Sequence, residues 1–371
     1  MNRLFVDVHI LQTVPPSNIN RDDTGSPKTA TYGGVRRARV SSQAWKRATR
    51  QEFRRLLDPA TLGVRTKRIV ELVADRIAKL DDALPEPEKL AAQALSAAGI
   101  TVEKRAKGAP EDVEQSKYLL FLSSSQIDRL AALAAESATT GSPIPKAAAK
   151  KAATGANSID VALFGRMVAD ASDLNIDAAA QVAHAISVHA VDNEFDYFTA
   201  VDDMAPADNA GAGMIGVVEF NSSTLYRYAT VNVALLRENI GDDVVTKHSV
   251  ATFLDAFVKS MPTGKQNTFA NRTLPDAVLI SLRTDQPINL VNAFEDPVDQ
   301  PGTARSTAAT RRLVDTFTSI ENSYGDGSAT NYVVVSNSTS TSLSELSEPQ
   351  SLCSAVDAVA AKVEDYLGAM K

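Results

Sequence analysis

The spacing of hydrophobic residues changes twice along this chain. Near the N-terminus, the side chains of residues 3–14 (RLFVDVHILQTV) would point alternately to two sides. Leu4 and Val6 lie on one side and Phe5 and Asp7 on the other, which predicts a first β-strand. A short strand is predicted at residues 117–123. Alternation returns after residue 180 and predicts further strands at 181–191, 216–220, 224–236, 276–284 and 331–336.

Helical spacing dominates the segment between these two sets of strands. Ser41 or Ser42 can cap a helix that runs to about Leu57 and stops before Pro59. Other helices are predicted near 65–80, 86–98, 125–138, 144–153, 244–260, 304–323 and 351–369. Turn-forming residues predict loops at 15–35 and 193–214 and a surface linker in the low-complexity segment 336–348. Strands interleaved with helices at both ends, around a helical insertion, predict an α+β sheet domain closed by both termini.

The charge of the chain is unevenly distributed. The 371 residues carry a formal net charge of −7, yet residues 33–50 (GGVRRARVSSQAWKRATR) hold six cations and no acid, so the rest carries −13. The six cations are Arg36, Arg37, Arg39, Lys46, Arg47 and Arg50. The combination of an acidic chain and one basic window excludes a protein that coats nucleic acid indiscriminately as a polycation. It favours a protein with a confined basic groove.

The remaining composition narrows the class of protein. A single cysteine, Cys353, excludes an intramolecular disulfide framework and a cysteine-rich zinc site, and fits a reducing cytoplasm. The N-terminal residues lack the features of a signal peptide, and no apolar run approaches the roughly 18 residues of a membrane span. We therefore expect a cytoplasmic protein with no membrane partner.

The basic window has the chemistry of a phosphate site. Lys46, Arg50 and Arg54 recur at intervals of four residues and share one helix face. Cations are unfavourable near a helix N-terminus, whereas the backbone N–H groups there, beside Ser41 and Ser42, attract anions. The alternative is a solvated basic face that pairs with acids from elsewhere in the fold.

Two further clusters offer donors. Residues 263–272 (TGKQNTFANR) are nearly all hydrogen-bond donors, but the spacing fails the P-loop pattern. They predict either a loop that grips a nucleic-acid backbone or a plain surface turn. The alanine-rich segment 144–153 carries Lys146, Lys150 and Lys151, which either solubilise a helix or form a weak electrostatic track for a second strand.

Signatures of catalysis, metal binding or cofactor binding are missing from the sequence. The glycines at 211, 213 and 216 spell GxGxxG, but a strand-like segment follows them where a dinucleotide site needs a helix. His184 and His189 lie on opposite sides of a predicted strand, which favours a core position for His184 over a metal site. We therefore expect a protein that is not an enzyme and uses no cofactor or metal.

Several separated blocks together resemble one family. They are NRDDTGSPKTATYGGVRRARVSSQAWKRATR, SIDVALFGRM, VAHAISVHAVDNEFDYFTAVDD, GVVEFNSSTLYRYATVNVALL, PTGKQNTFANRTLPD and NLVNAFE. In this order they resemble the CasC-type backbone subunit of the type I-E CRISPR surveillance complex, Cascade, a member of the RAMP superfamily. The likeness runs from the first strand to about residue 300, and is weaker at 58–155 and in the last 70 residues.

This resemblance implies a hand-shaped protein. The palm (residues 1–57 and 179–371) would be a modified RNA-recognition, ferredoxin-like fold with an antiparallel sheet. A helical fingers insertion would occupy 58–178, and a protruding thumb loop or hairpin 193–222. Copies of such a subunit stack along the CRISPR guide RNA (crRNA) and present its bases to target DNA. Implied partners are the crRNA, the target DNA strand, other copies of the chain, and the large, small, guide 5′-end cap and guide-processing subunits of Cascade.

The resemblance also implies roles for single residues. Contacts to the RNA backbone would come from Arg21, Arg39, Ser41, Gln43, Lys46, Arg47 and Arg50, and from Lys265, Gln266 and Thr268. Arg166 and Met167 would contact RNA near a kink. Phe198 and Ile215 would pack on displaced bases, with Met214 as the alternative to Ile215. Lys146, Lys150 and Lys151 would contact DNA.

Three classes of function follow from the sequence. The first is the non-catalytic crRNA-binding backbone subunit. The second is a CRISPR-associated endoribonuclease that processes guide precursors, which would need a general base such as His9 or His248 near the groove. The third, an unrelated metabolic enzyme, would need an enclosed apolar pocket with perturbed groups.

Overall fold

The computed structural model divides the chain into two compact units. It describes residues 3–104, 114–200, 214–299, 301–336 and 338–370. The sheet unit comprises residues 1–52, 182–230 and 250–371, and the helical unit comprises 53–181 and 231–249. The expected palm (1–57 and 179–371) and fingers (58–178) stay a prediction; their bounds differ from these two units chiefly at residues 231–249, which group with the helices.

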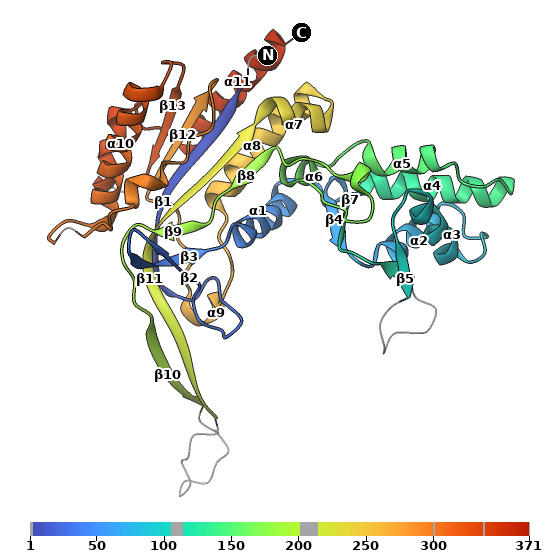
Figure 1. The fold of residues 1–371 in the computed structure, drawn as a ribbon, viewed down its shortest axis with the longest axis horizontal. Helices are drawn as coiled ribbons and strands as arrows, with labels where there is room; N and C mark the ends of the chain where they lie inside the picture. Colours follow the sequence, from blue (N-terminus) through green and yellow to red (C-terminus); the bar gives the residue numbers. More distant parts are fainter. Residues whose placement is uncertain (1–2, 105–113, 201–213, 300, 337, 371) are drawn as a thin grey trace, which may run out of the picture. The chain divides into compact units, whose positions relative to one another are not determined.

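An antiparallel sheet forms the centre of the sheet unit, as expected for an α+β fold (Figure 1). Its main path runs β13-β12-β1-β11-β9-β3-β2, and β8 and β10 also pair with β11. The strand bounds are β1 Phe5–Ser17, β2 Thr29–Tyr32, β3 Val35–Val40, β8 Ala180–Val182, β9 Ala185–Ser187, β10 Glu194–Ala200, β11 Met214–Asn232, β12 Ala277–Arg283 and β13 Thr330–Val335.

Burial in the sheet follows the position of each strand. β1 lies in the middle of the sheet between β11 and β12, and elements packed on both faces of the sheet bury both of its predicted faces, from Phe5 to Gln12. Every residue of β12 is buried, because both faces of this strand are covered and neither face contacts water. Adjacent residues of β11 point to opposite faces. Tyr226 packs in the cluster with Phe294, whereas Arg227 lies on the other face.

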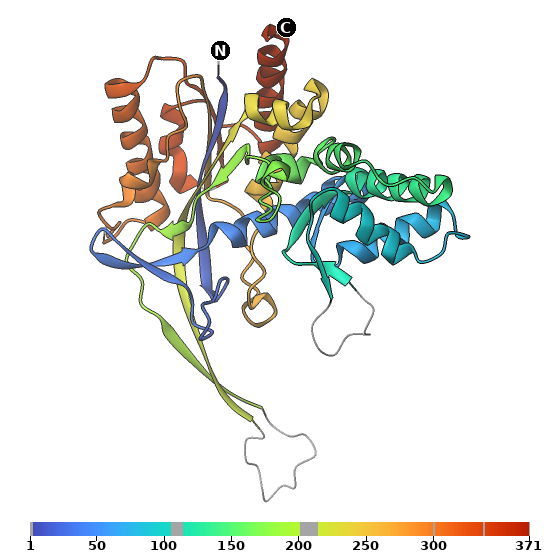
Figure 2. The same cartoon turned by 45° about the vertical axis from the view of Figure 1, so that its right-hand side comes forward.

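Helices cover both faces of this sheet. On one face, Leu11, Leu279 and Val333 pack with α10 (Arg305–Tyr324), η3 (Leu290–Phe294) and η4 (Ser338–Glu345). On the other, the rings of Trp45 in α1 (Ser42–Leu56) and Phe257 in α8 (Asp243–Lys259) lie against Arg227. The unit also holds α9 (Gln266–Phe269) and α11 (Leu352–Ala369) (Figure 2).

The helical unit has its own core and two small sheets. Its helices are α2 Ile69–Leu80, α3 Pro87–Ala97, α4 Ser124–Thr140, α5 Lys146–Thr154, α6 Ile159–Phe164 and α7 Val233–Ile240, with η1 Pro59–Thr61 and η2 Ser172–Leu174. β4 (Gly63–Thr66) pairs with β7 (Leu120–Ser123), and β5 (Val102–Lys104) with β6 (Glu114–Ser116). A capping box of Ser123 and Gln126 starts α4. The mostly helical block is therefore confirmed.

Several predicted segments differ from the structure. The loop at 15–35 holds the end of β1, β2 and the first residue of β3. The strand at 181–191 is shorter and interrupted after Val182, and the loop at 193–214 contains β10. The strand at 224–236 ends at Asn232, whose side chain accepts from the Leu235 amide and starts α7. The linker at 336–348 forms η4, because Leu343 is fully buried.

Candidate nucleic-acid interface

The connection between β1 and β2 folds back onto the start of α1. The Asn20 side-chain carbonyl accepts from the Ser41 amide at 2.8 Å, and its backbone carbonyl accepts from the Lys28 amide at 2.9 Å. Arg21 forms an antiparallel bridge with Pro27 and is exposed. These bonds hold two cations, Arg21 and Lys28, on the connection that reaches the N-terminus of α1.

The N-terminus of α1 is already capped. The Ser41 hydroxyl accepts from the Ala44 amide at 3.3 Å, and the Ser42 amide donates to Nδ1 of His184 at 3.3 Å. The predicted anion pocket of free N–H groups is therefore partly occupied by the protein's own acceptors. A phosphate predicted at this end of the helix would therefore rely on the neighbouring side chains more than on the backbone.

α1 separates a buried face from a polar one. Trp45, Ala48, Thr49 and Phe53 are buried. The other face carries the predicted residues Gln43, Lys46, Arg47 and Arg50, of which Gln43 and Arg47 are exposed and the two others half-buried. Partial burial lowers the pKa of Lys46 from its ordinary value. A helix with one cationic face is thus anchored to the sheet by its apolar face.

The cations of the basic window do not share one role. Arg37 is fully buried, and its guanidinium donates to the backbone carbonyls of Tyr32, Ser187, Phe294 and Glu295. Because all four acceptors are backbone carbonyls of this chain, Arg37 holds the β2–β3 hairpin to the sheet. Arg39 is half-buried and donates from Nε to the Thr29 carbonyl at 3.2 Å.

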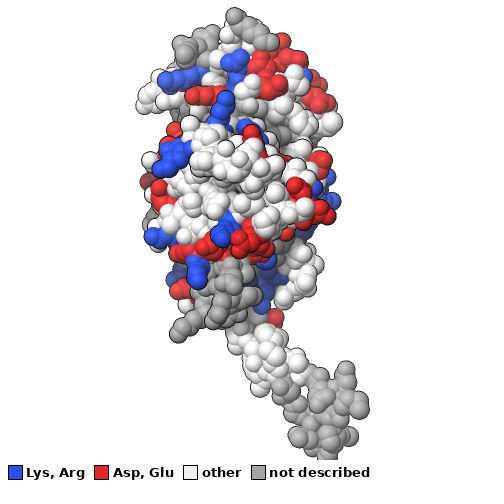
Figure 3. All heavy atoms as spheres, turned by 90° about the vertical axis from the view of Figure 1, so that its right-hand side faces the viewer, with Lys and Arg blue, Asp and Glu red and all other residues white. Residues whose placement is uncertain are grey.

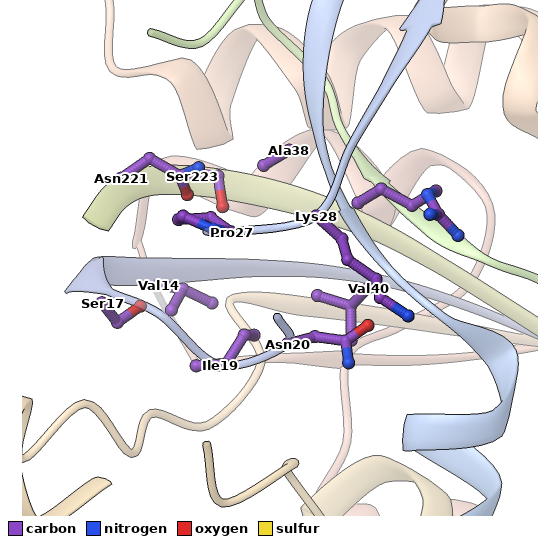
Figure 4. Close-up of a pocket in the computed structure, with 11 residues that line it drawn as sticks. Val14, Ser17, Ile19, Asn20, Pro27, Lys28, Ala38, Val40, Asn221 and Ser223 are labelled. Atoms are coloured by element: carbon purple, nitrogen blue, oxygen red, sulfur yellow. The ribbon is translucent and has the colours of Figure 1, made fainter. Parts of the chain in front are cut away.

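A small pocket lies beside Arg39, between the end of β1, the β1–β2 connection, β3 and β11 (Figure 4). Its lining residues are Val14, Ser17, Ile19, Asn20, Pro27, Lys28, Ala38, Arg39, Val40, Asn221 and Ser223. The Lys28 side chain extends along the pocket toward Asn20 and Val40. Sequence reasoning missed Lys28, although the lysine stands in a turn-rich stretch next to the basic window.

The donor-rich turn at 263–272 packs against the same connection. A Cβ on Gly264 would lie 2.3 Å from the Ile19 carbonyl oxygen, so only glycine allows this approach. Lys265 follows in the left-handed region with φ of 51° and is the residue directly before α9. Gln266 and Thr268 are exposed. The structure therefore brings this turn next to the β1–β2 connection that carries Arg21 and Lys28.

The β10–β11 hairpin carries large apolar side chains that are exposed. They are Phe195, Tyr197, Phe198, Met214, Ile215 and Val217. Phe198 lies opposite Gly216, and Ile215 lies opposite Thr199. A Cβ on Gly216 would stand 2.4 Å from the Phe198 ring, so this ring lies across the glycine. Residues 201–213 of the predicted thumb lie outside the described residues.

The base of the hairpin is tied to the β1–β2 connection. The Glu219 backbone carbonyl accepts from the Asn18 amide group at 2.9 Å, and its carboxylate accepts from the Ser26 hydroxyl at 2.9 Å. The Phe220 ring lies 5.8 Å from the ring of Phe269 in α9. One surface of the sheet unit therefore joins the connection, the 263–272 turn and the hairpin.

The helical unit holds the other predicted RNA contacts. Arg166 is buried, and its guanidinium donates to the carbonyl of Leu174 at 2.7 Å and to the side chain of Gln126 at 3.0 Å. Burial lowers the pKa of Arg166 to about 10. The expected contact needs an exposed guanidinium, and this structure instead uses the group to hold the unit together. Met167 beside it is 82% exposed.

The predicted DNA-binding lysines share α5. Lys146, Lys150 and Lys151 are all exposed. Lys150 forms an ion pair with Asp173 at 2.5 Å, which reduces its availability for phosphate. On the face shown in Figure 3, basic and acidic side chains are interspersed. The electrostatic track stays a prediction that depends mainly on Lys146 and Lys151.

The histidines differ from their expected positions. His184, expected in the core, is exposed between β8 and β9, whereas His189 is buried. His9 is buried, its Nδ1 lies 2.9 Å from the Tyr226 hydroxyl, and burial lowers its pKa to about 3. His248 is exposed on α8. Within the described residues, no group of three potential metal ligands forms, and no helix is long and apolar enough to cross a membrane.

Solved structures and a family model are similar to nearly the whole of this chain. A chain of a structure titled "CRISPR RNA-guided surveillance complex, pre-nicking" is 37% identical, with a TM-score of 0.87 over 97% of this chain and 100% of that one. A chain of another "CRISPR RNA-guided surveillance complex" is 31% identical, with a TM-score of 0.73 over 96% and 99%. No protein with a curated description matches. Residues 6–358 match the family described as CT1975-like protein, and the chain therefore belongs to that family.

Proposed function

We propose that this chain is the non-catalytic, crRNA-binding backbone subunit of a type I-E Cascade complex. One observation carries the proposal. The β1–β2 connection, the polar face of α1 and the 263–272 turn place their cations and donors on one sheet unit, beside a hairpin with exposed apolar side chains. The similarity to subunits of CRISPR RNA-guided surveillance complexes over nearly the whole chain supports the same role.

The chemistry of this surface suits a guide of any sequence. Cations such as Lys46 and Arg47 bind phosphates, which are the same at every nucleotide. Phe198 and Ile215 can pack on base faces without reading their edges. The subunit would therefore hold the RNA backbone and leave base edges available for pairing with a target DNA strand. The acidic remainder of the chain limits stray binding of nucleic acid elsewhere.

The hairpin also supports assembly of several copies. Its strands expose apolar side chains on both faces, since Tyr197 pairs with Val217 on one face and Ala200 with Met214 on the other. A monomer rarely leaves such surfaces uncovered unless they bind something. We infer that a neighbouring copy and its bound RNA cover them, with the large, small, cap and processing subunits at other surfaces.

The absence of catalysis is part of the proposal. His9 is buried and holds its proton too weakly to serve as a base near pH 7. We expect the wild-type chain to leave a guide precursor uncut over hours. A cut that disappears when any one of the four histidines becomes alanine would instead support the endoribonuclease.

The salt dependence of RNA binding tests the interface directly. Replacing both Lys46 and Arg50 by alanine should weaken binding nearly equally for unrelated guide sequences. It should also lower the slope of log affinity against log salt by about 1.4, because each phosphate contact on a single strand contributes about 0.7. Binding would be measured by fluorescence anisotropy from low to moderate salt.

A matched control removes the same charge elsewhere. Arg311→Ala with Lys362→Ala takes two exposed cations from α10 and α11. This control should leave the slope unchanged. Equal slopes for wild type, the Lys46 and Arg50 variant and the control would place the RNA on another surface and overturn the proposed interface.

A further inference from the structure

The interruption between β8 and β9 turns one side chain out of the sheet. Ala183 still donates its amide to the Tyr228 carbonyl at 2.9 Å, and β9 resumes with Ala185 opposite Val40. Between these two anchors, His184 is exposed instead of buried with its neighbours. Its ring lies beside Arg39 of β3 and the first amide of α1.

The contacts of His184 determine where its proton lies. Nδ1 is 3.4 Å from Nη1 of Arg39 and 3.3 Å from the amide nitrogen of Ser42. A guanidinium and a backbone amide can only donate, so Nδ1 is the acceptor and carries no proton. The neutral ring is then the Nε2–H tautomer. Partial desolvation, followed by the charges of Arg39 and Lys28, lowers the pKa of His184 from its ordinary value.

Arg39 is consequently held from two sides. Its Nε donates to the Thr29 carbonyl, and Nη1 donates to His184. An arginine has five N–H donors in a fixed fork, so this arrangement leaves donors for a ligand. A guanidinium whose direction is already fixed loses less conformational freedom when it binds a phosphate.

We propose that His184 is a positioning residue of the RNA-backbone interface, whose unprotonated Nδ1 fixes Arg39 against the N-terminus of α1 for contact with a phosphate. This inference rests on the proposed function. It assigns His184 no contact with the RNA and no role in cleavage. Its effect on RNA binding therefore passes entirely through Arg39.

Three substitutions distinguish the two ring nitrogens. His184→Asn can place its carbonyl oxygen near Nδ1 and keep an acceptor for Arg39. His184→Gln places its polar group near Nε2, and His184→Ala removes both. In the full-length chain, Ala and Gln should weaken binding of a guide RNA about fivefold, the equivalent of one ordinary hydrogen bond. Asn should stay within about twofold of wild type.

A double-mutant cycle with Arg39→Ala supplies the decisive readout. In that background, His184→Ala should have no further effect, because the group it positions is gone. Equal fold-losses in both backgrounds would overturn the positioning role, and so would an Asn variant as weak as Ala. Nitrogen-15 NMR of the imidazole offers an independent check, since a proton on Nδ1 at neutral pH would also contradict it.

Two controls distinguish a failure of the positioning role from a failure of the proposed function. His184→Ala and His184→Gln should lower the melting temperature slightly, because the Ser42 amide loses its acceptor, whereas His184→Asn should match wild type. If wild type binds guide RNA and His184→Ala binds it equally well, only the positioning role fails. If wild type does not bind guide RNA at all, the proposed function itself fails.

Discussion

The two halves of β11 make opposite use of their residues. The outer half, from Met214 to Phe220, pairs with β10 and exposes Met214, Ile215 and Val217. The inner half lies in the central sheet and buries polar side chains, among them Arg227 and Thr230. Within one continuous strand, apolar residues are exposed and polar residues are buried.

This contrast shows that burial follows the neighbours of a strand more closely than its hydropathy. In the inner half, the guanidinium of Arg227 donates to the Gln12 side chain and the Phe257 carbonyl, and the Tyr228 hydroxyl donates to Asp7. Polar groups paired in this way can be buried at modest net free energy. In the part of the chain that the structure describes, Met214, Ile215 and Val217 of the outer half stay exposed, and we propose that these side chains bind RNA and a neighbouring copy.

The largest effect should come from breaking the inner half at Arg227. Its guanidinium lies 3.8 Å from the Trp45 ring centroid, and burial lowers its pKa to about 9. Arg227→Ala would leave a cavity and would remove the donor to the Gln12 side-chain oxygen. It should lower the free energy of unfolding by about 3 kcal/mol. Urea denaturation measures this loss. Arg47→Ala, at an exposed site, should change the free energy of unfolding by less than about 0.5 kcal/mol. Equal losses for the two variants would contradict a structural role that is special to the inner half.

The next effect concerns His9, which packs between Tyr226 and Tyr228 of the inner half. Its pKa falls from 6.5 to about 3 on burial, so below pH 6.5 the unfolded chain binds a proton that the folded chain does not. Folding stability is thus lost as pH falls from 6.5 toward 3. Between pH 7 and 5, wild type should lose about 2 kcal/mol more than His9→Asn.

The comparison with His9→Asn isolates the histidine from Asp7. Burial raises the pKa of Asp7 to about 6, so the folded chain takes up that proton first. The Asp7 contribution is fully present below pH 3.8, and it is lost as pH rises through 6. The Asp7 contribution to folding stability is the same in wild type and in His9→Asn, so it cancels when the two stability curves are subtracted. Parallel stability curves for the two proteins would show that His9 titrates in contact with water.

The outer half should respond in binding and not in stability. Phe198→Ala removes an exposed ring, so the melting temperature should stay unchanged. Assembly on guide RNA should weaken by about 1.5 kcal/mol, within the range for one stacked base. Tyr324→Ala, which removes a still more exposed aromatic ring from α10, is the control. A Phe198 variant that melts early but assembles normally would reverse the comparison.

The smallest effect should come from Gly216. A methyl group there would displace the Phe198 ring, since only glycine leaves it room. Gly216→Ala should weaken assembly by about threefold, or roughly 0.7 kcal/mol, and have no further effect once Phe198 is alanine. Gly368→Ala, on α11 with open space around it, should leave assembly unchanged. An effect of Gly216→Ala that persists without Phe198 would separate the glycine from the ring.

Much of the fold follows from periodicity, and the exceptions share a cause. Long buried strands such as β1 and β12, and helices with strong caps or clear faces such as α1, lie where the pattern predicts. β2 and β10 were missed because TATY is a short polar edge strand and EFDYFTA mixes acids with aromatics. Their strand structure comes from pairing with β3 and β11, which local sequence does not encode.

The charge of the sequence locates the candidate site, but the sequence does not show which groups each charged side chain contacts. The basic window marks α1 correctly, yet sequence cannot show that Arg37 and Arg166 donate to buried carbonyls while Arg47 is exposed. His184 was assigned to the core by alternation, and the break between β8 and β9 exposes it. For Arg37 and His184, these choices depend on contacts between residues more than a hundred positions apart.

Recovery of the bound nucleic acid tests the central claim most directly. The chain would be co-expressed with its neighbouring subunits and a CRISPR array transcript, purified at high salt, and its retained RNA sequenced after nuclease digestion. We predict RNA of uniform guide length, protected at regular intervals whatever its sequence. Retention of no RNA, or of random cellular RNA, would contradict the backbone role.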